Sequence, residues 1–169
     1  MNIIDHRLAE IALEYVEGHS FERFVNAFYS ALTGIEFVPL GGIRDGGADA
    51  VLERGMFEAA KQTYYQASTA ENYRAKVRHT VRRLRDVGRD PRSLTYVTPR
   101  PIQNIDKEEE ILTRDTDVFI RIRDRRWIVS QINHNPATIA AFHSFLAPSV
   151  SFLTTIGGAT ILRARPKRG

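Results

Sequence analysis

The sequence predicts an α/β fold in which helices cross over between the strands of a sheet. Apolar residues recur at helical spacing over the first 32 residues. Short segments rich in β-branched and aromatic residues follow, separated by glycine turns. Beyond residue 70, short apolar strands alternate with amphipathic helices, and this alternation is typical of crossover connections in an α/β sheet.

Two helices are expected at the start of the chain. The first should end near Gly18, and its apolar stripe is expected to consist of Ile4, Leu8, Ile11 and Tyr15. The second should begin at Ser20, a residue type that favours helix N-caps, and end at Thr33-Gly34. Its buried stripe is expected to consist of Phe21, Phe24, Val25, Phe28 and Leu32.

Three strands should follow, over residues 35–40, 48–53 and 62–68. A glycine-rich turn, Gly41-Gly42-Ile43-Arg44-Asp45-Gly46-Gly47, separates the first two strands, and Arg54-Gly55 forms a turn after the second.

The second half of the chain continues the alternation. Helices are expected over 71–87, 107–112, 124–132 and 135–146, and strands over 94–98 and 118–122. Asp124 should cap the third of these helices, and Asn135-Pro136 pairs an N-cap residue with proline at the first helical position of the fourth. Trp127 is expected in the core, because Ile128 and Ile132 continue its apolar stripe.

The composition excludes several classes of protein. The 169 residues suit one domain, and no run of 18 apolar residues suggests a membrane span. The chain has no cysteine, so it has neither disulfides nor thiolate metal sites, and its start does not resemble a signal peptide. We expect a cytoplasmic protein with a main domain over 1–148. The remaining residues, 149–169, are expected to form either a hairpin around Gly157-Gly158 or a linker.

The predicted helix over 71–87 starts the most basic stretch of the chain. Eight lysines and arginines, against Asp86 and Asp90, lie between Asn72 and Arg92. Such an excess is typical of a surface that binds phosphates, but it is equally typical of a solvated helix face. The phosphate interpretation assigns nucleic-acid contacts to Arg74, Arg78, Arg82 and Arg85.

A second group of polar residues points to a metal. Because side chains alternate along a strand, Gln66 and Ser68 should share one face, and Asp49 can lie beside Gln66 if their strands pair. A carboxylate, an amide oxygen and the Ala67 carbonyl would suit Mg²⁺, which favours oxygen ligands and keeps several waters. Each residue also has a structural interpretation: a turn for Asp49, and a satisfied core amide for Gln66.

At these residues the sequence resembles the Mrr-like branch of the PD-(D/E)xK nuclease superfamily. The likeness runs from Phe21-Glu22-Arg23-Phe24-Val25 through Gly46-Gly47-Ala48-Asp49 to Tyr65-Gln66-Ala67-Ser68, and it covers about the first two-thirds of the chain. It implies a restriction-endonuclease-like fold, a mixed sheet flanked by helices. It also implies a DNA endonuclease that uses Mg²⁺ or Mn²⁺ held by Glu22, Asp49 and Gln66.

Ser68 departs from the family pattern, because it stands where the family has a lysine. In the family that lysine orients the attacking water and offsets transition-state charge, which a hydroxyl cannot do. Either the lysine has moved, with Lys76 on the next helix as the candidate, or the site is inactive and the domain binds DNA or mediates self-association. The first alternative makes Asp49, Gln66, Ser68 and Lys76 the catalytic set.

The resemblance also implies partners. Nucleases of this kind often form the N-terminal effector domain of restriction or anti-phage defence proteins, so an ATPase or sensor region is expected beyond this chain. The substrate is expected to be DNA, and cleavage of both strands implies a homodimer or larger oligomer. No membrane partner is expected.

Overall fold

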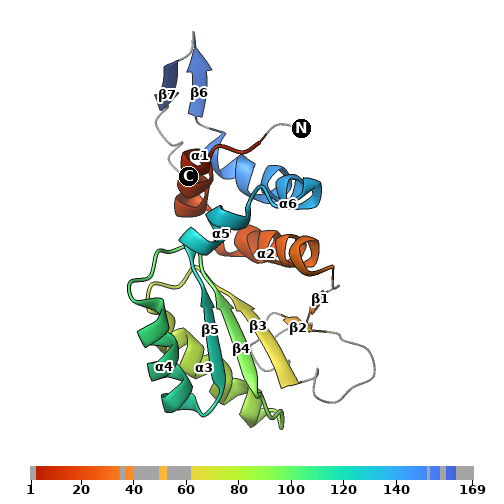
Figure 1. The fold of residues 1–169 in the computed structure, drawn as a ribbon, viewed down its shortest axis with the longest axis vertical. Coiled ribbons are helices and arrows are strands. Elements are labelled where there is room, and N and C mark those ends of the chain that lie inside the picture. The colour runs from red at the N-terminus through yellow and green to blue at the C-terminus, as the bar shows by residue number, and fades with distance from the viewer. Residues whose placement is uncertain are drawn as a thin grey trace, which may run out of the picture.

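The computed structural model describes residues 3–34, 37–39, 50–52, 62–151, 153–156 and 159–162. Within these residues the chain is a mixed α/β structure, as the alternation of strands and helices predicts (Figure 1). No helix in the described ranges is long and apolar enough to cross a membrane.

The central sheet has five strands in the order β1-β2-β3-β4-β5. They are β1 (Phe37–Pro39), β2 (Ala50–Leu52), β3 (Thr63–Ala67), β4 (Ser93–Val97) and β5 (Phe119–Arg123). The first three pair antiparallel, and β3, β4 and β5 pair parallel. In this register Tyr65 lies beside Thr95, and Thr95 lies beside Arg121.

Helices α3 (Tyr73–Asp86) and α4 (Ile105–Thr116) are the crossovers between the parallel strands, and both cover the same face of the sheet (Figure 1). Every second residue of these strands points toward the two helices and belongs to one hydrophobic cluster. The helices contribute Val77, Val81, Leu84 and Leu112 to this cluster, and the strands contribute Tyr64, Leu94, Tyr96, Ile120 and Ile122. The apolar stripe expected for the basic helix is therefore confirmed at its three aliphatic positions.

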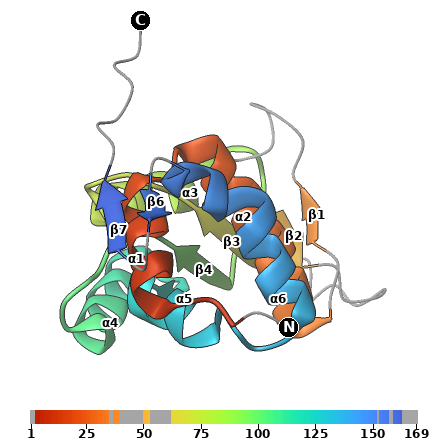
Figure 2. The same cartoon turned by 90° about the horizontal axis from the view of Figure 1, so that it is seen from above.

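A second layer consists of α1 (His6–Tyr15), α2 (Gly18–Thr33), α5 (Arg125–Gln131) and α6 (Pro136–Ala141). Figure 2 shows α6 lying alongside α2, and the two helices are in contact. This layer packs against Ala67 and Val97, the last residues of β3 and β4, in a separate hydrophobic cluster. The layer therefore covers the carboxyl ends of these strands.

Three expected helix boundaries are confirmed. Gly34 ends α2 with a φ of 66°, a left-handed conformation that glycine adopts at low cost. Asp124 caps α5 by accepting a hydrogen bond from the Trp127 amide, at 3.1 Å. Asn135 caps α6 in a reciprocal capping box with Thr138.

Two expectations for the N-terminal helices are wrong. Helix α2 begins at Gly18 with Glu17 as its N-cap, so Ser20 lies inside the helix. Tyr15 is 37% exposed at the end of α1, where Ala9, Ala12 and Leu13 form the buried face instead. The two small alanine side chains allow this helix to pack closely, whereas Tyr15 at its end is partly open to solvent.

Beyond α6 the chain continues through a π-helical turn (Phe142–Leu146) and a 3₁₀ turn (Ala147–Val150). Strand β6 (Leu153–Ile156) then pairs antiparallel with β7 (Ala159–Leu162), and Ile156 lies opposite Ala159. This pairing agrees with the hairpin interpretation of the tail. The domain boundary after residue 148 stays a prediction.

Candidate functional site

Gln66 lies near the carboxyl end of β3 and faces α3. Its side chain is 2% exposed. Its Oε1 accepts a hydrogen bond from the Thr80 hydroxyl at 2.8 Å, and its Nε2 donates to the Ala67 carbonyl at 3.1 Å. These contacts are those of a satisfied core amide, and they also fix the direction in which the amide oxygen points.

Ser68 follows β3 and begins the turn toward α3. Its backbone N–H donates to the Val97 carbonyl at 3.0 Å, which extends the parallel pairing by one residue. Its Oγ accepts from the Ala70 N–H at 3.1 Å. Ser68 thus stabilises the turn, and its hydroxyl hydrogen remains able to donate elsewhere.

Lys76 is half-buried on α3, one helical turn before Thr80. Residues four apart lie on the same side of a helix, so Lys76 lies on the side of α3 that contacts Gln66. Its side chain helps to line a shallow hollow of about 610 Å³ together with Ala70, which belongs to the turn after Ser68. Among the described residues it has no acidic partner. Lys76 therefore lies in a hollow that adjoins the turn after β3.

Glu22 is half-buried on α2. Gly18, one turn earlier on the same helix, is so close to the turn after β3 that an added β-carbon would lie 3.4 Å from the Thr69 hydroxyl oxygen. The side of α2 that carries Glu22 is thus directed toward the end of β3. Asp49, the remaining metal ligand expected from the sequence, lies outside the described residues.

Three of the four arginines assigned to phosphate contacts form hydrogen bonds with residues of α4. Arg74 forms two hydrogen bonds with the Glu108 carboxylate, at 2.7 and 2.6 Å. Arg78 pairs with Asp115 at 2.7 Å, and Arg85 donates to the Thr116 carbonyl at 2.8 Å. These contacts hold α4 against α3, and two of them cancel part of the positive charge of the helix.

Arg82 is exposed, and no such contact to α4 is present for it in the described part of the chain. Hydrogen bonds from Arg74 and then from Tyr73 lower the pKa of Glu108 to about 2. The Glu108 carboxylate is therefore charged throughout the physiological range. The role of the four arginines in DNA binding stays a prediction.

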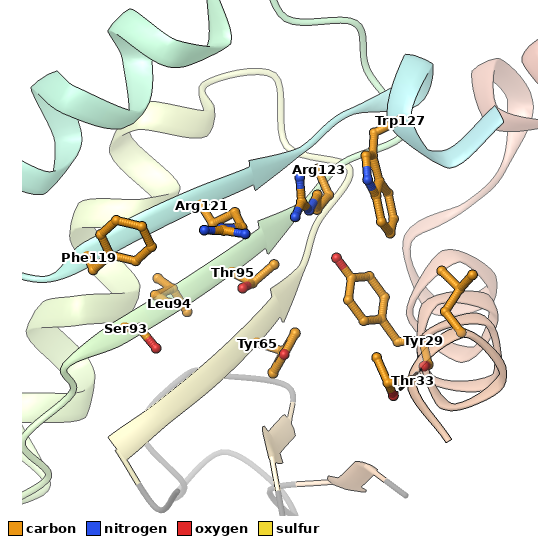
Figure 3. Close-up of a pocket in the computed structure, with 11 residues that line it drawn as sticks. Tyr29, Thr33, Tyr65, Ser93, Leu94, Thr95, Phe119, Arg121, Arg123 and Trp127 are labelled. Atoms are coloured by element: carbon orange, nitrogen blue, oxygen red, sulfur yellow. Dashed lines mark hydrogen bonds between the residues drawn. The ribbon is translucent and has the colours of Figure 1, made fainter. Parts of the chain in front are cut away.

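A groove on the other face of the sheet was not foreseen from the sequence (Figure 3). It has a volume of about 370 Å³ and lies between α2 and the part of β3, β4 and β5 that the helical layer leaves uncovered. Its polar and aromatic lining includes Tyr29, Tyr65, Arg121, Arg123 and Trp127. The alternation of Arg121 and Arg123 with buried isoleucines was the signal in the sequence, because it places both arginines on one face of β5.

The aromatic rings of this groove contact one another. Tyr29 stacks on Trp127 with ring centres 5.4 Å apart, and it meets Tyr65 edge-on at 5.3 Å. Burial raises the pKa of Tyr29, and the positive charge of Arg123 opposes that rise. Tyr29 is thus a neutral phenol under ordinary conditions.

Comparison of the chain with protein-family models, curated proteins and solved structures gives no match. The PD-(D/E)xK resemblance therefore rests on the residues that carry it, and its functional implications are proposals.

Proposed function

We propose that this chain is a metal-dependent DNA endonuclease domain of the PD-(D/E)xK type that acts in restriction or anti-phage defence. The order and pairing of its elements support the proposal. Helix α2 precedes three antiparallel strands, and a crossover through α3 then adds β4 parallel to β3. The resemblance implies a mixed sheet flanked by helices, and this order of elements supports the proposal.

The register between β2 and β3 is the observation that carries the proposal. Ala50 lies opposite Tyr65, and the two strands are antiparallel. In the sequence, Asp49 directly precedes Ala50, and Gln66 directly follows Tyr65. Asp49 and Gln66, which are both assigned to the metal, are therefore adjacent in sequence to the two residues of one cross-strand pair, Ala50 and Tyr65.

Two of the described residues assigned to the metal carry oxygen donors of the kind that a hard cation prefers. Glu22 offers a carboxylate, and Gln66 offers a side-chain amide oxygen, which accepts a hydrogen bond from the Thr80 hydroxyl. When bound, Mg²⁺ supplies an activated water and stabilises charge during phosphodiester hydrolysis. The Thr80 hydroxyl holds the Gln66 amide in one orientation, and Lys76 supplies a positive charge on the same side of α3.

The second candidate function is an inactive nuclease-fold module that binds DNA or mediates self-association. The burial of Gln66 and its hydrogen bond to Thr80 favour this candidate, because a core amide needs no metal to be satisfied. The use of Ser68 in a turn favours it as well, since no strand lysine is present.

Plasmid cleavage in the presence of Mg²⁺ or Mn²⁺ tests the proposal. The wild type is compared with Asp49→Ala and Lys76→Ala, with Lys107→Ala as a matched control on the exposed side of α4. We expect cleavage by the wild type and the control, and loss of cleavage in both site variants. Loss in Asp49→Ala alone keeps the nuclease and removes Lys76 from it. Absence of cleavage by the wild type, with DNA binding intact, selects the inactive module.

A further inference from the structure

The described lining of the groove between α2 and the open part of the sheet carries positive charge. Eleven of the residues that the structure describes line the groove, and among these there are two arginines and no acid. Arg121 is exposed and Arg123 is half-buried, and within the described residues neither guanidinium has a carboxylate partner. Arg74 and Arg78 on α3 differ in this respect, because each is paired with an acid of α4.

Aromatic rings hold the two guanidinium groups in place. The centre of the Arg123 guanidinium lies 4.8 Å from the ring centre of Trp127, and that of Arg121 lies 5.4 Å from the ring of Phe119. Guanidinium groups stacked in this way still present their N–H donors at their edges, which is the geometry that binds phosphate oxygens. The groove therefore combines guanidinium cations with the aromatic rings against which they lie.

Tyr65 provides a second kind of contact surface. Its ring is half-buried and lies in the row Tyr65, Thr95 and Arg121, which crosses the three parallel strands. Figure 3 shows these side chains along one wall of the groove, with Arg123 and Trp127 at one end. A partly exposed aromatic ring beside arginines is the arrangement on which proteins stack a nucleobase while they bind its phosphate.

We propose that this groove binds a nucleoside phosphate, with the phosphate on Arg121 and Arg123 and the base against Tyr65. The volume of about 370 Å³ is near the lower end of the range of ligand pockets, roughly 300–1,000 Å³, so the groove takes one nucleotide unit. This unit is either a free nucleotide or one nucleotide of a single strand, since both offer the same phosphate and base.

The groove is distinct from the proposed metal site. Tyr65 and Gln66 are neighbours on β3, and their side chains point to opposite faces of the sheet. Gln66 is covered by α3, whereas Tyr65 lines the groove. The inference therefore goes beyond the proposed nuclease function and does not depend on it.

Trp127 is the only tryptophan of the chain, and it lines the groove, so its fluorescence reports occupancy directly. The probes are adenosine 5′-monophosphate, a short single-stranded oligo(dA) with blocked ends, adenosine and inorganic phosphate. We expect saturable quenching by the monophosphate and weaker effects of adenosine and of phosphate alone. Tighter binding of the oligonucleotide assigns the groove to a single strand, and tighter binding of the monophosphate assigns it to a free nucleotide; either result supports the proposal.

Variants identify the contacts. Arg121→Gln should weaken binding of the better probe about tenfold or more, while Arg126→Gln, an exposed arginine of α5 outside the groove, should not. Tyr65→Leu should weaken it about five- to hundredfold, and Tyr65→Phe should restore it. Arg121 is exposed, so its replacement leaves the core intact and a loss of binding cannot be attributed to misfolding.

Two results would overturn the proposal. The first is that Arg121→Gln binds the probe as tightly as the wild type does. The second is that inorganic phosphate binds as tightly as the monophosphate and that Tyr65→Leu has no effect, because the groove would then bind an anion without recognising a base. Binding is measured without divalent metal, so the outcome is independent of whether the chain cleaves DNA.

Discussion

The hydrogen bond between Thr80 and Gln66 gives the sharpest test of the packing under α3. Both side chains are buried, with Thr80 0% and Gln66 2% exposed, and the hydroxyl lies 2.8 Å from the amide oxygen. Thr80→Val replaces the hydroxyl with a methyl group of similar size. Loss of a donor to a buried acceptor costs about 1–3 kcal/mol, so we expect a loss of about 2 kcal/mol in the free energy of unfolding. For a chain of this length, each kcal/mol lowers Tm by roughly 2–4 °C, which gives a decrease of about 4–8 °C.

Urea unfolding followed by circular dichroism measures this loss, and a double-mutant cycle assigns it to the pair. Thr80→Ser keeps the hydroxyl and should lose only the contribution of one methyl group, about 1 kcal/mol. In a Gln66→Met background, Thr80→Val should cost much less, because both polar partners are then replaced by apolar groups. If Thr80→Val lies within about 0.5 kcal/mol of the wild type, or costs the same in both backgrounds, the bond does not stabilise the core as argued.

Two further predictions concern the contacts that fix the helices. Because Arg74 and Tyr73 lower the pKa of Glu108 to about 2, its carboxylate should stabilise the fold fully above its unfolded value of about 4.3, and this stabilisation should be lost as the pH falls toward 2. The urea midpoints of the wild type and Glu108→Gln should therefore differ at pH 6 and converge near pH 2; a constant difference would contradict the assignment. Asn135→Ala removes the capping box of α6 and should cost about 0.5–2 kcal/mol, whereas Asn135→Ser keeps an N-cap oxygen and should cost less. Equal losses in both Asn135 variants, measured by thermal unfolding, would show that the cap is not the cause.

The sequence is sufficient to predict the elements where local signals agree. Helix α3 follows from the spacing of Val77, Val81 and Leu84. The end of α2 follows from Gly34, and the start of α6 follows from Asn135. The start of α2 could not be predicted in this way, because Ser20 is a better N-cap by residue type than Glu17. The start of α2 depends on how the helical layer packs, and this packing cannot be derived from the spacing of residues in the sequence.

The partners of the arginines could not be predicted either. Charge clustering identifies Arg74 and Arg78, but their acids Glu108 and Asp115 are 34 and 37 residues away. Only the parallel pairing of β3, β4 and β5 brings α3 beside α4. The groove was missed for a related reason, since the alternation in β5 places Arg121 and Arg123 on one face but does not say that this part of the face stays uncovered.

The division of the core into two hydrophobic clusters affects how the protein unfolds locally. One cluster lies between α3, α4 and the sheet, and the other joins the helical layer to the strand ends; they have no residue in common. Parts of a protein with separate cores can unfold independently at different free energies. Amide hydrogens of β4, which is paired on both sides, should therefore exchange last, and those of the helical layer should form an earlier, separate group. Transient opening of the helical layer would then widen the groove, while α3, α4 and the parallel strands stay folded.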